Sequence, residues 1–212
     1  MNKMTIIAIT ILVVVIAAVA WGPLASNVEQ APYTVIESHG SIEIRKYPEI
    51  IVAETSVSGE RNSAIEQGFR ILAGYIFGKN KSANGAAIVS SDGAGENTAS
   101  QKIAMTAPVM QQSLDGKWQV RFIMPKNYDI DTLPKPVDDN ITIKKIIEKK
   151  YAVIRFSGTD NDESLAQNLS ELSRFILSNG LRPLSEPAYA FFNPPWTLPM
   201  FRRNEIMIEV AP

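Results

Sequence analysis

Two stretches of this chain repeat each other at a constant offset of 99 residues. Residues 42–59 and 141–158 align without a gap and are identical at seven of 18 positions. Each stretch contains two β-rich runs separated by a charged turn, which predicts a β-hairpin in each. A helical pattern with apolar residues every three to four positions then follows each stretch. The repeat therefore predicts two pseudo-equivalent halves.

The helical patterns cover residues 62–78 and 161–179. Two further strand-like runs follow each helix, at residues 102–109 and 118–124 in the first half and 188–192 and 205–210 in the second. The element order β-β-α-β-β, twice, predicts one α+β domain with eight main strands and two helices. The apolar stripes predict that the most buried helix residues are found among Ile65, Phe69, Leu72, Leu165, Leu169 and Leu172.

A separate apolar segment precedes the repeat. No charged residue occurs between Lys3 and Glu29, and residues 6–20 are almost wholly aliphatic. A helix of about 17 residues spans roughly 25 Å, the low end for crossing a bilayer. Three alternatives remain open for this predicted N-terminal apolar helix. It is a membrane anchor with Trp21 at the interface, a signal peptide cleaved after the small-x-small sequence that ends at Ala20, or a buried core helix.

The charge of Lys3 sets the expected orientation. With Lys3 on the inner side, the rest of the chain faces out of the cytoplasm, which is the periplasm in a Gram-negative cell. We therefore assign residues 1–30 to the anchor or signal peptide with its linker, and residues 31–212 to the folded domain. Residues 81–100, rich in Ala, Gly, Ser and Asn, are expected to form an exposed, mobile loop.

The composition excludes many common kinds of catalytic and metal-binding site. The absence of cysteine excludes disulfides, thiolate nucleophiles, iron–sulfur clusters and covalent c-type haem attachment. A formal net charge of −1 gives no general attraction to nucleic acid, so we expect no nucleic-acid partner. The single histidine, His39, excludes paired-histidine metal sites and is either a ligand of haem iron or an exposed turn residue.

Two basic groups are further candidates. Five cationic residues cluster around the second predicted hairpin, and they form either a patch for propionates or phosphates or a solvated face: Lys144, Lys145, Lys149, Lys150 and Arg155. The run Arg202-Arg203-Asn204-Glu205 contains either a structural ion pair or a contact for an anionic ligand, because arginine binds carboxylates in a rigid bidentate geometry.

Four ordered motifs resemble a known family. Residues 43–48 read EIRKYP, residues 69–78 read FRILAGYIFG, residues 102–109 read KIAMTAPV, and residues 194–205 begin with PPWT and end with RRNE. Together these strings resemble the signature of the SOUL haem-binding protein family. The resemblance covers about residues 32–210, nearly all of the chain after the apolar segment.

This resemblance implies both a fold and a function. The fold is a duplicated β-α-β-β unit that forms a distorted eight-stranded barrel-like sheet with two helices. The function is non-enzymatic, non-covalent binding of haem or a related tetrapyrrole in a shallow apolar site beside the first helix. Carried over by position, the implied site offers Phe69, Leu72, Ala73 and Ile76 as apolar contacts, and Arg70 or Arg202 as a propionate contact.

The chain departs from the family at one position. Some members carry an iron-ligating histidine in an EIRHY string, whereas this sequence has Lys46 there. His39 is thus the only histidine available as a metal ligand. The alternatives to a haem binder are a binding module for another planar or amphiphilic molecule and a hydrolase of the gyrase-inhibitor-like type. A buried, unpaired glutamate in the pocket would favour cationic ligands or hydrolysis.

Overall fold

The computed structural model describes residues 28–82 and 100–211. The predicted N-terminal apolar helix and most of the predicted loop at residues 81–100 lie outside the described residues. Within the described ranges, no helix is long and apolar enough to cross a membrane.

The described residues contain two α-helices, one short 3₁₀ helix and thirteen strands. In chain order they are β1 (Glu29–Gln30), β2 (Thr34–His39), β3 (Ile42–Tyr47), β4 (Ile50–Val57), α2 (Arg61–Ile76), β5 (Asn80–Lys81), β6 (Thr106–Ala107), β7 (Val109–Leu114), β8 (Lys117–Ile123), β9 (Lys135–Pro136), β10 (Thr142–Ile146), β11 (Lys149–Phe156), α3 (Asp162–Ser178), β12 (Ala188–Phe191), η1 (Pro199–Phe201) and β13 (Asn204–Glu209).

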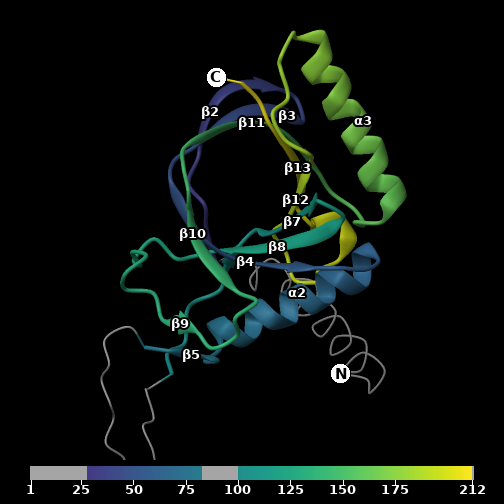
Figure 1. Cartoon of the computed structure of the whole chain (residues 1–212). Coiled ribbons are helices and arrows are strands. Elements are labelled where there is room, and N and C mark those ends of the chain that lie inside the picture. Colours follow the sequence, from purple (N-terminus) through teal and green to yellow (C-terminus); the bar gives the residue numbers. More distant parts are fainter. Residues whose placement is uncertain (1–27, 83–99, 212) are drawn as a thin grey trace, which may run out of the picture.

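Nine of these strands form one curled sheet, an open half-barrel, in the order β10-β4-β8-β7-β12-β13-β11-β3-β2 (Figure 1). The predicted α+β class with two helices is confirmed, but the expected count of eight strands is too low, since β2 adds a ninth at one edge. Without β2 the strand order is symmetric about its centre. Read from the two ends inward, the order pairs equivalent strands of the two halves: β10 with β3, β4 with β11, β8 with β13 and β7 with β12. The sheet thus has the internal symmetry that the repeat predicts.

The predicted hairpins are wrong. β3 pairs with β11, and β4 pairs with β10, so the two strands of each repeated stretch lie at opposite ends of the sheet. A tight two-residue hairpin turn needs residues that accept a positive φ, usually Gly or Asn. The connections Pro48-Glu49 and Ile147-Glu148 offer neither, and none of these four residues has a positive φ. The chain therefore crosses to the other end of the sheet at each of these two connections.

The strand register nevertheless preserves the repeat. Ile44 lies opposite Ala152 in the pair of β3 with β11. The repeat relates Ile44 to Ile143 and Ala152 to Ala53, because the members of each pair are 99 residues apart. Ile143 lies opposite Ala53 in the pair of β10 with β4. The two halves therefore exchange strands in equivalent registers.

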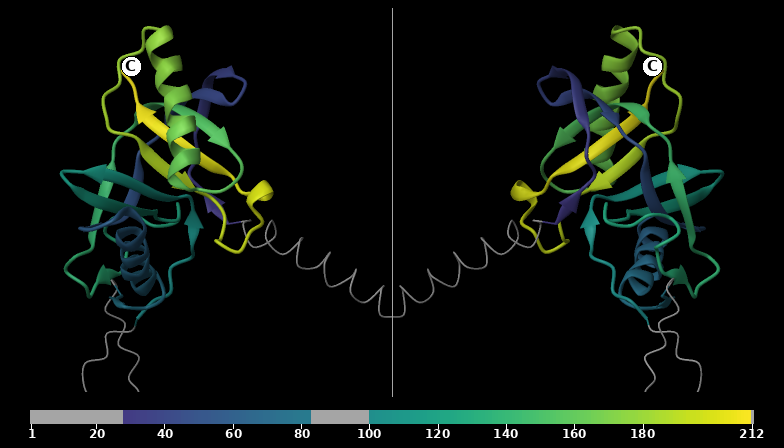
Figure 2. Two further views of the ribbon diagram at one scale, coloured as in Figure 1. Left: turned by 90° about the vertical axis from the view of Figure 1, so that its right-hand side faces the viewer. Right: turned by 90° about the vertical axis from the view of Figure 1, so that its left-hand side faces the viewer.

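Three buried clusters hold the fold together. α2 packs on β4 and β8, and α3 packs on β11 and β13, at opposite ends of the molecule (Figure 2). These contacts make two helix-side clusters, while the third lies on the inner face of the curl around Met110, Val153 and Met207. All residues of the three clusters lie between positions 28 and 210, so a chain of residues 28–212 keeps every one of them.

The run predicted as one strand at residues 102–109 is interrupted. Residues 100–105 are irregular, and the short β6 is separated from β7 by Pro108, which follows a cis peptide bond. Proline has no backbone N–H to donate to a sheet, so it divides the run. β6 instead pairs in parallel with β1, which places Glu29 and Gln30, assigned above to the linker, in the folded part of the chain.

The buried stripe of α2 differs from the predicted stripe by one position. Leu72 is buried as predicted, as are Leu165 and Leu172 in α3, but Ile65 and Leu169 are only partly buried and Phe69 is 40% exposed. α2 instead presents Ala64, Gly68 and Leu72 to the sheet. Small residues at the contact let the helix approach the strands closely, and this turns Phe69 to the side.

We expect Gly68→Ala to destabilise the protein by about 1–3 kcal/mol, the usual cost of an overpacked core. A Cβ atom at position 68 would lie 2.6 Å from Cγ2 of Val120. The matched control is Gly74→Ala in the same helix, where the nearest atom is Cδ of the flexible Lys79 side chain at 3.1 Å. Denaturant unfolding should show a loss only for Gly68→Ala; equal stability of the two variants would contradict the close packing.

Candidate functional site

A cleft lies on the helix-bearing face of the sheet, between the first half of α2, the central strands β7 and β12, and the segment at residues 193–204. The cleft opens to solvent, and its volume is about 1020 Å³ when the open solvent at its mouth is counted. Its lining comprises Arg61, Asn62, Ile65, Glu66, Phe69, Val109, Gln111, Asp160, Phe191, Asn193, Pro195, Arg202 and Asn204.

One wall of the cleft is apolar. Ile65 and Phe69 come from α2, while Val109 and Phe191 lie opposite each other in the pair of β7 with β12. The Phe69 ring packs edge-on against Phe122, with the ring centroids 5.4 Å apart. This contact fixes the ring at the cleft, while its partial exposure leaves surface for a ligand.

Two arginines supply positive charge at the cleft. Arg61 Nη1 lies 3.2 Å from Oδ1 of Asp162, and Arg202 Nη1 lies 3.5 Å from Oδ1 of Asp160. Arg202 Nε also donates to the carbonyl oxygen of Thr197 at 2.8 Å, which holds the 193–204 segment in place. Asp160 and Glu66 balance the two cations in the lining.

Two polar atoms at the cleft have unused hydrogen-bonding capacity. Nε of Arg61 and Oε1 of Gln111 are both buried and make no hydrogen bond. Buried polar groups in native proteins almost always have a partner, so an unpaired donor and an unpaired acceptor in one cleft call for an explanation. A polar group of a ligand, or a water molecule, would satisfy them.

The structure brings together two of the residues that the family resemblance indicates. Phe69 and Arg202, from distant parts of the sequence, line the same cleft. Arg70 instead lies on the exposed side of α2, where its Nη2 pairs with Oε1 of Glu66 at 2.8 Å. Ala73 is half-buried and lies outside the cleft lining.

The last two apolar candidates are part of the core. Leu72 and Ile76 are fully buried against the sheet. They position α2, and in this structure they expose no surface to a ligand.

His39 lies away from the cleft, at the edge strand β2. Its Nε2 is 3.5 Å from Oε2 of Glu37, and its ring is 5.1 Å from the Phe175 ring of α3. Lys46 is also distant from the cleft and pairs with Glu148 at the surface, 2.8 Å between Nζ and Oε1. Within residues 28–82 and 100–211, no group of three or more His, Cys, Asp or Glu side chains could hold a metal ion.

Sequence reasoning missed Arg61, Gln111 and Phe191 as site residues. The repeat contained a signal for the first of them, because Arg61 and Asp160 occupy equivalent positions at the starts of the two helices. Nη1 of Arg61 donates to the carbonyl oxygen of Asp160 at 3.4 Å. Equivalent positions meet in this way only near the internal symmetry axis, so the cleft lies where the two halves join.

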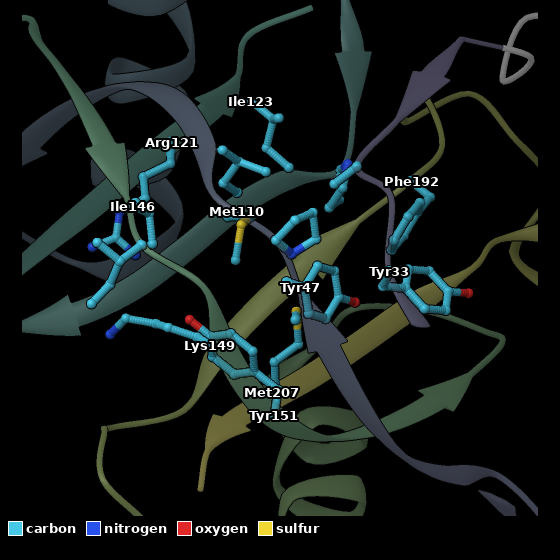
Figure 3. Close-up of a pocket in the computed structure, with 15 residues that line it drawn as sticks. Tyr33, Tyr47, Met110, Arg121, Ile123, Ile146, Lys149, Tyr151, Phe192 and Met207 are labelled. Carbon is cyan, nitrogen blue, oxygen red and sulfur yellow. The ribbon is translucent and has the colours of Figure 1, made fainter. Parts of the chain in front are cut away.

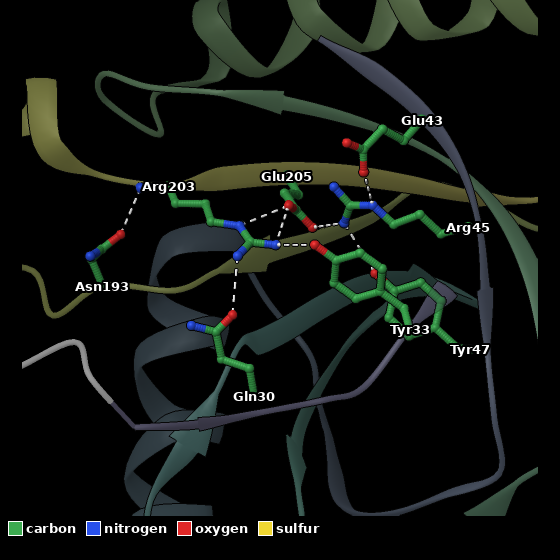
Figure 4. Close-up of polar contacts among 8 residues, drawn as sticks. All are labelled: Gln30, Tyr33, Glu43, Arg45, Tyr47, Asn193, Arg203 and Glu205. Atoms are coloured by element: carbon green, nitrogen blue, oxygen red, sulfur yellow. Dashed lines mark hydrogen bonds and ion pairs between the residues drawn. The ribbon is translucent and has the colours of Figure 1, made fainter. Parts of the chain in front are cut away.

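A buried ion-pair network lies on the other face of the sheet (Figure 4). Glu205 has no exposed surface and accepts hydrogen bonds from Arg45 Nη1 at 2.8 Å and from Arg203 Nε at 2.9 Å. Arg45 Nε also donates to Glu43 at 2.6 Å, and its guanidinium lies 4.3 Å from the centre of the Tyr33 ring. The network ties β3 to β13 across the intervening β11.

The network keeps its charges despite burial. Burial alone would lower the pKa of Arg45, but the hydrogen bond and charge of Glu205 outweigh it and raise that pKa above its ordinary value. Arg203 is thus a structural ion-pair partner, whereas its neighbour Arg202 lines the cleft. The structural ion-pair interpretation of the RRNE run therefore applies to Arg203.

Comparison with known proteins identifies the family. Residues 28–90 and 93–209 match the family model described as SOUL heme-binding protein. The chain belongs to this family. Its EIR and RRNE motifs supply Glu43, Arg45, Arg203 and Glu205, so the two ends of the SOUL signature meet in the buried network.

Individual relatives agree with the family and the fold. Human Heme-binding protein 2 is 28% identical over 189 residues, which cover 84% of this chain and 82% of that protein. The EcmrR C-terminal domain superposes with a TM-score of 0.57 at 14% identity, covering 84% of this chain and 98% of that one. A hydrolase from Listeria innocua gives a TM-score of 0.52 at 12% identity, covering 83% and 94%. At such identities, the structural likenesses show the fold alone.

Proposed function

We propose that this SOUL-family domain binds haem or a related tetrapyrrole non-covalently in the cleft beside α2. The observation that carries the proposal is the combination of an apolar wall at Phe69 with two arginines, one of which has an unpaired buried Nε. The family description and the name of the human relative support the ligand class.

The chemistry of the cleft fits such a ligand. Haem is a flat apolar disc with two carboxylates, so burying its face against Ile65, Phe69 and Phe191 is favourable. Arginine is well suited to the carboxylates, because its planar guanidinium donates two parallel hydrogen bonds. Arg61 and Arg202 would therefore orient the propionates, while the aromatic side chains exclude water from the ring. When bound, haem would supply a conjugated macrocycle and a redox-active iron.

We expect the cleft to recognise the macrocycle more than the iron. Among the described residues that line it, none is His, Cys, Met, Tyr or Lys. Metal-free protoporphyrin IX should therefore bind the chain of residues 28–212 within about threefold of the affinity of haemin, in the micromolar range or weaker. The dimethyl ester of protoporphyrin IX should bind more weakly, because it cannot pair with the arginines.

Absorbance and fluorescence titrations measure these affinities. His39→Ala should leave both the haemin affinity and its spectrum nearly unchanged. Loss of binding and of a low-spin spectrum in His39→Ala, or a haemin affinity far above that of the metal-free porphyrin, would show that an iron bond dominates.

The buried carboxylates support binding over hydrolysis. Glu205 is paired with two arginines, and Glu54 pairs with Arg121 at 2.9 Å and with Lys144 at 2.6 Å. Both carboxylates are thus occupied by ion pairs, and neither lines the cleft. We therefore propose a binding protein without catalytic activity.

We further propose that the apolar segment at residues 6–20 tethers this domain to a membrane, with the domain outside the cytoplasm. The full chain should stay with membranes through high-salt and carbonate washes, whereas a chain of residues 28–212 should be released. A mature protein beginning near Trp21 by mass spectrometry would show a cleaved signal peptide and an exported domain instead.

A further inference from the structure

An exposed apolar loop, residues 196–201, connects β12 to β13 and contains η1. Four of its six side chains are large, apolar and open to solvent: Trp196 is 67% exposed, Leu198 41%, Met200 68% and Phe201 46%. The sequence has no charged residue between positions 186 and 202. An exposed apolar surface of this kind usually marks a contact with a protein or a membrane.

The backbone of the 196–201 loop is held from its inner side. The N–H of Gly158 donates to the carbonyl oxygen of Pro199 at 2.9 Å, and Nε of Arg202 donates to the carbonyl oxygen of Thr197 at 2.8 Å. The apolar side chains are therefore displayed on an ordered backbone, and docking them on a partner requires little further ordering of the chain.

The 196–201 loop lies beside β1, the first strand that the structure describes. Arg203 donates from Nη1 to Oε1 of Gln30 in β1 at 3.1 Å, and its guanidinium lies 3.8 Å from the centre of the Phe192 ring. Phe192 and Tyr33, which come just before the loop and just after β1, lie together at one end of the space inside the curl (Figure 3). β1 and η1 thus share one end of the molecule (Figure 2).

The length of the linker limits how far this end can lie from the apolar segment at residues 6–20. Seven residues, 21–27, separate the end of that segment from Val28. Even fully extended, seven residues span at most about 25 Å. A membrane that holds the segment therefore lies within about that distance of β1 and the loop. So short a tether also gives the loop a high effective concentration at the lipid surface, so that a weak contact is sufficient.

We propose that the 196–201 loop docks on the surface of the lipid bilayer and sets the orientation of the domain there. This inference rests on the proposed tether at residues 6–20. Tryptophan is enriched at membrane interfaces, because its ring is apolar while its N–H can meet water, and Trp196 is the most exposed aromatic side chain of the loop. Met200 and Phe201 supply apolar surface that can be buried at the boundary of the acyl chains.

Docking in this way also places the cleft beside α2. Pro195 and Arg202, which flank the loop on its two sides, both line that cleft. The cleft is then held next to the lipid surface, close to any amphiphilic ligand that the bilayer contains.

The test uses the absence of cysteine from the chain, because one introduced cysteine then carries the only nitroxide spin label. Met200→Cys places the label on the loop. The matched control is Leu177→Cys, since Leu177 is 74% exposed near the end of α3. Arg182, four residues after α3, bonds to Ala211 beyond the end of β13, whereas the loop precedes the start of β13. The two labels therefore lie at opposite ends of the domain (Figure 2).

Each labelled full chain is placed in phosphatidylcholine vesicles, because a loop without charge needs no anionic lipid. Flotation first shows whether the chain is tethered. Power saturation then compares the accessibility of the label to oxygen, which concentrates in lipid, with its accessibility to a water-soluble nickel chelate. The ratio of oxygen to chelate accessibility at position 200 should be several-fold higher than for the same label on the chain of residues 28–212 in solution. The ratio at position 177 should not change.

A further variant tests the apolar side chains themselves. Trp196→Ser with Phe201→Ser, added to the chain labelled at position 200, should return the ratio to its value in solution while the chain still floats with the vesicles.

Three results would overturn the docking. A chain that floats while both labels stay equally accessible to the chelate would disprove loop docking and leave the tether intact. Low accessibility of position 200 to both reagents would show that protein covers the loop, either a second copy or the apolar segment itself. A chain that does not float would disprove the tether and, with it, the docking.

Discussion

Replacing Glu205 with glutamine should lower the free energy of unfolding by about 3–5 kcal/mol, the usual cost of removing one partner of a buried ion pair. Glu205 is fully buried, and it is the common partner of Arg45 and Arg203. Arg45 is itself buried, with 2% of its side chain exposed, so the substitution leaves its charge without its nearest buried counterion. Because whole domains are stable by about 5–15 kcal/mol, this loss is a large share of the total.

The matched control is Glu148→Gln, which breaks an ion pair at the surface. Glu148 pairs with Lys46, and both side chains are at least half exposed. Exposed pairs contribute about 0–1 kcal/mol, so this variant should unfold close to the parent protein in guanidinium. Unfolding energies within 1 kcal/mol of each other for the two variants would show that the network contributes little to stability.

Phe69→Asp should weaken haemin binding by about 1.5–3 kcal/mol, or roughly tenfold to 150-fold. The substitution removes the largest apolar side chain that α2 gives to the cleft and introduces a negative charge near the expected position of the propionates. Both changes act against an apolar, dianionic ligand. Absorbance titration with haemin measures the affinity directly.

The same helix offers a control for this substitution. Phe77 follows α2, is 61% exposed and lies outside the cleft lining, so Phe77→Asp adds the same charge without touching the proposed site. Circular dichroism checks that both variants keep their helices. If Phe77→Asp weakens haemin binding as much as Phe69→Asp does, the ligand is held by nonspecific apolar contact.

Sequence periodicity was sufficient to predict the order of the main strands and both helices. The apolar patterns at residues 62–78 and 161–179 correspond to α2 and α3, and the 99-residue offset reappears in the strand register. Partner choice between strands was not predictable in the same way. β3 and β4 are neighbours in sequence, yet each pairs with a strand about 100 residues away, and this choice depends on how the whole sheet curls.

For the site, too, the sequence predicted local features but not the contacts between distant parts of the chain. The motif at residues 69–78 lies in the helix that borders the cleft, but it could not show which side of that helix faces the sheet. That orientation depends on Gly68, whose lack of a side chain allows contact with Val120. Leu72 therefore lies in the core, while Phe69 and Arg202 meet at a cleft that only the folded chain assembles.

The most direct test of the proposed haem site is paramagnetic line broadening of backbone amide signals by haemin, recorded on the chain of residues 28–212. Binding in the cleft predicts broadening at Ile65, Phe69, Gln111 and Phe191, with the amide of His39 unaffected. Broadening centred on His39 and β2, or spread evenly over the surface, would contradict the account.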